Sequence, residues 1–552
     1  MAEGTPQLPP AAMLLFGLLL HTVSQHGPTA DKPKEKPNFI IILADDIGWG
    51  DLDANQLEER ANNTPYLNLM ALQGLRMTDF HSPASTCSPS RAAILTGRYG
   101  LRNGVTHNFG VKSLAGLPLS EVTLPQLLHK AGYHTAMIGK WHLGHNGLYS
   151  PTNRGFDYYL GIPFSNDMGC TDIPGYNLPQ CLPCDSHGPQ RNIHGGCYSR
   201  IGLPLIENST IVEQPLDLWT LTEQYKSAAL RIIHNASERG QPYLLYIALA
   251  HMHVPLAPPL SPDAPTTDNH PNSGVYAASL RELDSLVGAI KNASEATDRD
   301  NTLIWFTGDN GPWEQKCQYA GSVGPFRGKW QTSKGGGSAK QTTWEGGHRV
   351  PTVAYWPGRI PANTTSSSLL SGMDIFPTVL SLAGVTLPSD RRYDGIDATN
   401  ILLHGEQLGH EFLFHPNSGA AGRFGDLQTV RSGRHKAFYI TGAAEACGGE
   451  TGKQQVHDPP LIFDLERDEA EETPLDVKTT EYQVVAERIA RRREKLLWDI
   501  ATDKSVSIAD YRTDESAAPC CDLTQTVCRC PRLVILSNFR KITHLISDHK
   551  TY

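Results

Sequence analysis

One cysteine, in the stretch TCSPSRAAILTG, lies where several signals for a helix start coincide. Ser88 suits a helix N-cap, Pro89 the first helical position and Gly97 the C-terminal stop. We therefore expect Cys87 just before a helix, where free backbone N–H groups and the helix dipole favour an anion. Arg91 falls in the first turn, and its forked donors suit a tetrahedral oxyanion. Because the chain has 11 cysteines, an odd number, one must stay out of any set of internal pairs. A disulfide-bonded or inert cysteine at this helix start is the alternative.

Polar side chains also follow four apolar runs of similar design. The runs NFIIILA, HTAMIG, YLLYIALA and NTLIWFTG are continuous, which is typical of strands buried on both faces of a parallel sheet. Any single polar pair after such a run is most simply a strand end or turn. In open α/β sheets, however, ligands bind outside the carboxyl ends of the strands. The residues that follow the runs should therefore meet at one edge: Asp45 and Asp46, Lys140 and His142, His251 and His253, Asp309 and Asn310.

Helical patterns separate these runs. The alternation predicts a large doubly wound, mostly parallel α/β domain over residues 36–415. A glycine-rich loop at 333–340 delivers Lys340. The expected helices lie at 124–132, 221–236, 276–293 and 371–384.

The pattern of apolar and polar residues changes after about residue 415. Short strand-like runs and a charged helix at 481–503 predict a smaller α+β domain over residues 416–530, with a short antiparallel sheet. Residues 531–552 form a tail to which we assign no role.

The chain has the features of a secreted protein. Residues 11–20 form an apolar run that is too short to span a bilayer but suits the core of a signal peptide over residues 1–25. No later stretch is apolar enough for a span, so we expect no stable membrane insertion. In an oxidising compartment the clustered cysteines favour loop disulfides, although CLPC with His187, His194 and Cys197 also matches a zinc pattern. Glycosylation is expected at five sequons: Asn62, Asn208, Asn235, Asn292 and Asn363.

Composition excludes one class of partner. The net charge of -9 and the pI near 6.2 argue against a nucleic-acid binder, which would need a basic surface. A local basic pocket on an acidic protein is still compatible with these values.

Two motifs resemble the signatures of a known family. TCSPSRAAILTG resembles the first sulfatase signature throughout, and GYHTAMIGKWH resembles the second. The resemblance to the formylglycine-dependent arylsulfatases runs from about residue 36 to 530 and implies an alkaline-phosphatase-like fold. It also implies that the formylglycine-generating enzyme oxidises Cys87 to formylglycine (3-oxoalanine), an aldehyde that hydrates to a diol. One hydroxyl of the diol then attacks sulfur, and the other lets the enzyme release sulfate, a form of covalent catalysis.

The resemblance assigns the metal ligands among the strand-end residues. It implies that Asp45, Asp46, Asp309 and Asn310 hold one divalent ion, and that the hydroxyl of residue 87 completes the shell. A set of hard oxygen ligands favours Ca²⁺, with Mg²⁺ second.

The remaining roles also come from the resemblance. Cationic side chains would counter the charge of the sulfate: Arg91, Lys140 and Lys340. His142 resembles the residue that deprotonates the diol. His253, together with Lys340, resembles the pair that contacts sulfate and helps to protonate the leaving oxygen, with His251 left as a structural or substrate-pocket histidine. Ser165 resembles a sulfate-pocket residue, and a plain loop serine is the equal alternative.

The sequence therefore predicts a sulfatase that cleaves a sulfate ester on an aryl or sugar group. The overall resemblance further implies a lysosomal enzyme, with an extracellular one second, that acts on a sulfated glucosamine of heparan sulfate. Two alternatives stay open. One is a phosphate or phosphonate ester hydrolase, for which only one hard-oxygen ligand set is present where two-zinc phosphatases need a second, His-rich set. The other is a catalytically silent glycan-binding paralogue.

Overall fold

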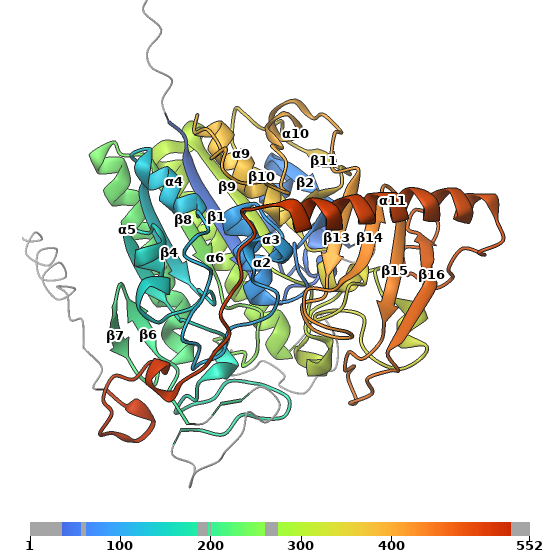
Figure 1. Ribbon diagram of the computed structural model, residues 1–552. Helices are drawn as coiled ribbons and strands as arrows, with labels where there is room; N and C mark the ends of the chain where they lie inside the picture. Colours follow the sequence, from blue (N-terminus) through green and yellow to red (C-terminus); the bar gives the residue numbers. More distant parts are fainter. Residues whose placement is uncertain (1–35, 57–61, 185–196, 199, 260–273, 531–552) are drawn as a thin grey trace, which may run out of the picture. The chain divides into compact units, whose positions relative to one another are not determined.

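The computed structural model describes residues 36–56, 62–184, 197–198, 200–259 and 274–530. A ten-stranded sheet forms the larger part, in the order β11-β2-β10-β9-β1-β8-β4-β5-β6-β7 (Figure 1). Its strands are β1 (Asn38–Ala44), β2 (Leu75–Met77), β4 (His134–Gly139), β5 (Tyr158–Gly161), β6 (Leu205–Glu207), β7 (Thr210–Glu213), β8 (Tyr243–Ala248), β9 (Thr302–Gly308), β10 (Thr352–Tyr355) and β11 (Thr364–Ser366). A short parallel pair lies beside it: β3 (Phe80–His81) and β12 (Leu370–Ser371).

The four apolar runs of the sequence are the four central strands. β1 pairs in parallel with β8 on one side and with β9 on the other, and β4 pairs in parallel with β8. Every residue of β1, β8 and β9 is buried, as a strand with helices on both faces requires. Antiparallel pairs occur toward both edges, between β9 and β10 and between β5 and β6. The prediction of a large, mostly parallel α/β sheet is confirmed.

Helices cover both faces of this sheet. The side chains of β1 divide between two apolar cores: Ile40 and Ile42 pack on the side of α1, α5 and α6, and Phe39 and Ile41 on the side of α2, α4 and α9. The helices are α1 (Pro65–Gln73), α2 (Cys87–Thr96), α3 (Gly100–Asn103), α4 (Leu124–Lys130), α5 (Leu218–Arg239), α6 (Gly274–Asp298), α7 (Lys329–Thr332), α8 (Glu345–His348), α9 (Ile375–Leu382) and α10 (Thr399–His404).

The second sheet has four antiparallel strands and a long helix across it (Figure 1, orange and red). Its strands are β13 (Phe412–Pro416), β14 (Leu427–Ser432), β15 (His435–Thr441) and β16 (Gln455–Asp464), and its helix is α11 (Thr480–Thr502). Phe414 and Val430 of the sheet share an apolar core with Tyr482 and Ile489 of α11. The smaller α+β part is therefore confirmed, and its first strand begins at Phe412.

After α11 the chain returns to the large sheet. The backbone N–H of Leu114 donates to the carbonyl of Arg512, and that of Cys530 donates to the carbonyl of Gln214 near β7. The last described residues therefore lie against the part of the fold that contains the ten-stranded sheet (Figure 1).

Three of the 11 cysteines are free thiols, not only the single one that an odd count requires. Cys87 is a buried free thiol, and Cys521 and Cys530 are free thiols that share a hydrogen bond. Loop disulfides are confirmed for the first cysteine cluster, whereas His187 and His194 of the zinc pattern lie outside the described residues. The pairs are Cys170–Cys184, Cys181–Cys197, Cys317–Cys447 and Cys520–Cys528.

The surface and the chain ends bear on the secretory prediction. All five sequon asparagines are exposed. None of the helices in the described ranges is long and apolar enough to cross a membrane. The predicted signal peptide and the tail after residue 530 lie outside the described residues.

Candidate active site

The carboxyl ends of β1 and β9 bring the acidic residues together. The strands are neighbours, and the backbone N–H of Asp309 donates to the carbonyl of Ala44 over 2.9 Å. Asp46 takes a positive φ of 53° directly after β1, in the left-handed region that side chains rarely adopt outside functional or strained sites. Its backbone N–H faces Asp309 Oδ1 at 3.3 Å, and its Oδ1 accepts from Asn310 Nδ2 over 2.7 Å. The two strand ends thus place three carboxylates, those of Asp45, Asp46 and Asp309, close to the amide of Asn310.

Cys87 is the first residue of α2, not the residue before the helix. The N-cap is Thr86, whose extended backbone (φ -143°, ψ 160°) starts the helix two residues earlier than expected. Ser88 does not cap, because its Oγ donates to the carbonyl of His142 over 2.6 Å. The predicted C-terminal stop at Gly97 is confirmed by its left-handed φ of 67°. The thiol of Cys87 lies 3.6 Å from Asp45 Oδ1, so the start of α2 faces the acidic residues.

Three cationic side chains surround the carboxylates. Arg91 bridges two of them, with its guanidinium 2.7 Å from Asp309 Oδ2 and 3.2 Å from Asp45 Oδ2. Lys140, which follows β4, donates to Asp45 over 2.5 Å. Lys340 comes from the loop between α7 and α8 and lies 2.6 Å from Asp46 Oδ1. We call these six charged residues, with Cys87 and Asn310, the catalytic cluster.

Two histidines border the catalytic cluster. His142 has a φ of 57°, and its Nε2 is 3.0 Å from the carbonyl of Phe109, while its Nδ1 is buried and has no hydrogen-bond partner among the described residues. His253 places Nε2 3.7 Å from Asp46 Oδ2. The carbonyl of His251 accepts from the backbone N–H of Asp45 over 2.6 Å, but its imidazole is engaged elsewhere, with Nε2 3.0 Å from Thr222 Oγ1 in α5. The position of His253 beside the acidic residues fits the role predicted for it better than that of His251.

Burial and the neighbouring charges keep both histidines neutral. Burial, then Lys140 and Arg91, holds the pKa of His142 well below its ordinary value. Burial, then Lys340 and Lys140, does the same for His253. A neutral imidazole carries a proton on one nitrogen and a lone pair on the other, so each ring can give or accept a proton during a reaction.

The carboxylates divide in their acidity. Burial opposes the charge of Asp45, but Lys140 and Arg91 outweigh it and hold the pKa of that carboxyl well below its usual range. Burial, together with Asp45 and Asp309, raises the pKa of Asp46 to about 6 against the attraction of Lys340. Burial and then Asp45 likewise raise the pKa of Asp309. Asp46 and Asp309 thus have raised pKa values, in part because the neighbouring carboxylates repel their charge. A cation placed among the carboxylates would relieve that repulsion.

The donor set fits one hard divalent cation. Asn310 Oδ1 is buried and accepts no hydrogen bond from any described residue. Asp45, Asp46, Cys87 and His253 each offer one atom within 4.8 Å of the others. Carboxylate and amide oxygens are the ligands that Ca²⁺ and Mg²⁺ prefer.

Cys87 itself is unsuited to act as a thiolate. Burial, and then the charge of Asp45, raises the pKa of its thiol to about 12. Because the thiolate is the reactive form of cysteine, an unmodified Cys87 would be an inert group in the most polar part of the protein.

Three further residues at this site differ in how well the sequence indicated them. Ser165 is buried in the loop after β5, next to Asn166, whose Nδ2 faces the carbonyl of His253 at 3.4 Å. Sequence analysis missed Asp167, a buried carboxyl with one unpartnered oxygen among the described residues, whose pKa burial raises to about 7. It also missed Trp313, whose ring centroid is 5.3 Å from that of His253. Only the position of Trp313 directly after the Asp-Asn-Gly-Pro turn could have signalled it.

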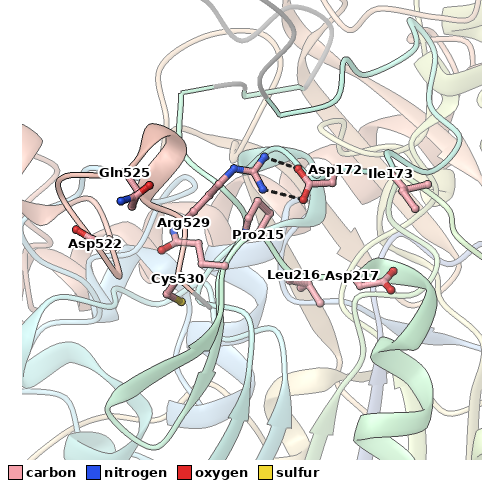
Figure 2. Close-up of a pocket in the computed structure, with 10 residues that line it drawn as sticks. Asp172, Ile173, Pro215, Leu216, Asp217, Asp522, Gln525, Arg529 and Cys530 are labelled. Carbon is pink, nitrogen blue, oxygen red and sulfur yellow. Dashed lines mark hydrogen bonds and ion pairs between the residues drawn. The ribbon is translucent and has the colours of Figure 1, made fainter. Parts of the chain in front are cut away.

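An open cavity lies away from the catalytic cluster. It measures about 670 Å³ and is lined by residues near the loop disulfides and by the last described residues (Figure 2). Arg529 reaches across it to pair with Asp172 through both guanidinium nitrogens. None of its lining residues belongs to the predicted site, so the proposed chemistry is not assigned to this cavity.

Comparison with known proteins defines the class. The chain belongs to the sulfatase family: the model described as "Sulfatase" matches residues 37–385, and that described as "C-terminal region of aryl-sulfatase" matches residues 408–530. Among solved structures, the PsFucS1 sulfatase from Pseudoalteromonas sp. matches with a TM-score of 0.71 at 26% identity, covering 86% of this chain and 92% of that chain. The protein is therefore a sulfuric ester hydrolase.

Two relatives narrow the likeness within the family. Arylsulfatase G of Homo sapiens is 58% identical over 497 residues, which is 90% of this chain and 93% of the relative. Arylsulfatase G of Canis lupus familiaris is 57% identical over 512 residues, covering 93% of this chain and 94% of the relative. The resemblance to the arylsulfatases, and to arylsulfatase G in particular, is confirmed.

Proposed function

We propose that this enzyme hydrolyses sulfate esters through a formylglycine made from Cys87, with one bound calcium ion. The observation that carries the proposal is the arrangement of the catalytic cluster. Three carboxylates and an unpartnered amide oxygen converge beside residue 87, and three cations stand around them. Such an arrangement can hold a cation and a tetrahedral dianion side by side.

The chemistry of residue 87 follows from its surroundings. A hydrated formylglycine supplies one hydroxyl to bond with sulfur and a second through which sulfate is released. Residue 87 is the first residue of α2, where the helix dipole favours an anion, and Arg91 adds a fixed positive charge there. His142, neutral and with a free Nδ1, is the group suited to hold the proton that the diol gives up.

Calcium is the proposed ion because all the assigned ligands are oxygens. Asp45, Asp46, Asp309 and Asn310 would hold it, together with the oxygen of the modified residue 87. A bound calcium polarises sulfate oxygens and favours an ionised hydroxyl at residue 87. Magnesium is the second choice for the same set.

Two residues, His253 and Lys340, are proposed to act on the leaving oxygen. Lys340 Nζ lies 2.6 Å and His253 Nε2 3.7 Å from the carboxylate of Asp46, whereas Arg91 pairs with Asp45 and Asp309. Lys140 and Lys340 would balance the charge on sulfate, and His253 with Lys340 would protonate the alcohol as it departs. Ser165, buried nearby, is proposed to contact sulfate.

The substrate and the compartment are proposed from the family resemblance described above. We propose that the natural substrate is a sulfated glucosamine of heparan sulfate and that the enzyme works in the lysosome after passage through the secretory pathway. Five exposed sequons and four disulfides support that route. Aryl sulfates should serve as test substrates, and the formylglycine-generating enzyme is the proposed partner in maturation.

The test combines mass and rate. The tryptic peptide that contains residue 87 is measured by mass spectrometry, and the same preparation is assayed with 4-nitrocatechol sulfate and with the matching phosphate. The proposal expects the aldehyde mass and preferential cleavage of the sulfate. A thiol mass in an active preparation would overturn the formylglycine proposal, and faster cleavage of the phosphate would favour a phosphate ester hydrolase instead.

A further inference from the structure

Trp313 stands at the end of the turn that carries two of the proposed metal ligands. The turn follows β9 through Asp309, Asn310, Gly311 and Pro312. The backbone N–H of Lys340 donates to the carbonyl of Pro312 over 3.0 Å, which ties the loop of Lys340 to the residue before the tryptophan. The position of Trp313 is therefore fixed relative to the catalytic cluster by two independent segments of the chain.

The indole ring contacts both groups that we assign to the leaving oxygen. Its centroid lies 5.3 Å from the ring of His253 and 4.5 Å from Lys340 Nζ. Lys316 Nζ lies 4.3 Å from the same ring. The indole N–H is already used, because it donates to Gln315 Oε1 over 3.0 Å. What Trp313 can offer to a substrate is thus its aromatic carbon surface.

Trp313 differs from its neighbours in exposure. Trp313 is half-buried, whereas the three side chains that it contacts are buried: His253, Lys340 and Lys316. Its ring therefore extends from the two groups assigned to the leaving oxygen, His253 and Lys340, toward solvent. A substrate whose sulfate reaches the catalytic cluster must leave the rest of its ring on the solvent side. That ring, aryl or sugar, then meets an aromatic wall next to its departing oxygen. A half-buried tryptophan is ordinary by itself. What distinguishes Trp313 is that it contacts both groups proposed to protonate the leaving oxygen, His253 and Lys340.

We propose that Trp313 contacts the ring that bears the sulfate ester and thereby determines which sulfate esters the enzyme accepts. This inference rests on the proposed function, because it concerns the same site. Contact with a flat or ring-shaped substrate buries apolar area and aligns the scissile C–O–S unit with His253 and Lys340. Sulfate alone, which has no ring, gains nothing from this contact.

The experiment compares a ligand with a ring and a ligand without one. The variant Trp313→Ala is assayed for kcat/KM with 4-nitrocatechol sulfate and with a 6-O-sulfated or 3-O-sulfated glucosamine, and for inhibition by inorganic sulfate. We expect kcat/KM to fall roughly tenfold for the esters, the size of one good aromatic contact, and the inhibition constant of sulfate to stay within about twofold. Trp313→Phe, which keeps an aromatic wall, should recover most of the loss.

A second tryptophan supplies the matched control. Trp330 is also half-buried and carries a lysine ammonium over its ring, Lys334 at 3.9 Å, but it lies outside the catalytic cluster. Trp330→Ala should leave both constants unchanged once rates are normalised to the folded fraction.

The outcomes separate this inference from the proposed function. If Trp313 only held Lys340 in place, sulfate inhibition would weaken as much as ester turnover, and the inference would be overturned. If Trp313→Ala matched the wild type on both esters, the inference would fail while the proposed function stood. If the wild-type enzyme cleaved neither ester, the proposed function would fail and this inference with it.

Discussion

The catalytic cluster has a counterpart in a second set of buried charges, located between the large sheet and the four-stranded sheet. We call it the interface cluster. Each cluster holds three carboxylates and three permanent cations. The members of the interface cluster are Asp79, Glu345, Glu471, Arg349, Arg431 and Lys436.

The two clusters differ in which kind of group is at the centre. Glu345 is surrounded by donors from both parts of the fold, with Lys436 Nζ at 2.8 Å, Arg349 Nε at 2.8 Å and His81 Nε2 at 3.0 Å. Burial opposes its charge, but Lys436 leads a set of cations that holds the pKa of Glu345 well below its ordinary value. In the catalytic cluster the carboxylates converge instead, and Asp46 has a raised pKa.

The comparison shows how equal numbers of buried charges serve different ends. A carboxylate enclosed by cations needs nothing further, so the interface cluster joins two parts of the fold. In the catalytic cluster the carboxylates instead gather beside an amide oxygen that accepts no hydrogen bond from any described residue, and for this arrangement we propose a bound cation. Each cluster contains a carboxyl with a lowered pKa, Asp45 or Glu345, and a carboxyl with a raised pKa, Asp46 or Glu471. The arrangement of the groups around the carboxylates, and not the sign of a pKa shift, therefore separates the two clusters.

The largest expected effect is at residue 87. Cys87→Ser should lower turnover of 4-nitrocatechol sulfate by on the order of 10³-fold or more, because a serine has no second hydroxyl through which to release sulfate. The melting temperature should stay near that of the wild type, since the two side chains are close in size. Near-normal turnover by this variant would rule out the formylglycine proposal.

Metal binding gives the next test. Asp309→Asn removes one carboxylate from the convergent set, and we expect a loss of about 100-fold or more in activity. Calcium should raise the melting temperature of the wild type and not that of the variant, which gives a readout independent of turnover. An equal calcium-induced shift in both proteins would remove Asp309 from the proposed ligands.

The interface cluster should respond in stability and not in turnover. Glu345→Gln leaves buried cations without their central carboxylate and should reduce the free energy of unfolding by about 3–5 kcal/mol. The rate per folded molecule should stay at the wild-type value. Glu466→Gln is the control, because that exposed side chain pairs with Arg434 at 3.7 Å and should cost less than about 1 kcal/mol. A large loss of turnover per folded Glu345→Gln molecule would contradict the division between the clusters.

The smallest effect concerns pH. Burial raises the pKa of Glu471 to about 7 from an ordinary 4.5, against the attraction of Lys436 and with the repulsion of Glu345. The folded protein therefore keeps a proton that the unfolded chain releases between these values. This stabilisation is complete below about pH 4.5 and is lost as the pH rises toward 7, with a slope of up to about 1.4 kcal/mol per pH unit.

Glu471→Gln, which mimics the protonated acid, should flatten the fall in stability between pH 5 and pH 7. Denaturant unfolding at several pH values measures it. An unchanged slope in the variant would show that Glu471 does not keep its proton in the folded protein. The lowered pKa of Glu345 acts in the opposite sense only at more acidic pH, because it loses its stabilising charge there.

Much of the fold and of the candidate site could be predicted from local sequence signals. The buried strands were visible as continuous apolar runs because burial on both faces of a sheet demands apolar residues at successive positions. Asp45 and Asp309 could be placed at one edge because both directly follow parallel strands. Lys340 could be assigned only through the family resemblance, since nothing local in its loop indicates where that loop ends.

Other features could not be seen because they depend on contacts between distant residues. Ser88 has the residue type of an N-cap, yet the carbonyl of His142 takes its hydroxyl and Thr86 starts the helix instead. Trp313 gains its meaning from His253 and Lys340, which lie on other segments of the chain.

By itself the sequence determined the class of enzyme and the central strands, and it predicted residue 87 as the reactive position, because short motifs and local periodicity carry these signals. Only the tertiary structure decided which polar residues lie together. Asp46 and Glu345 are both buried acids, and no local pattern tells them apart. Their opposite pKa shifts arise from neighbours far away in sequence, since the charge of a buried carboxyl is set by whatever the fold packs around it.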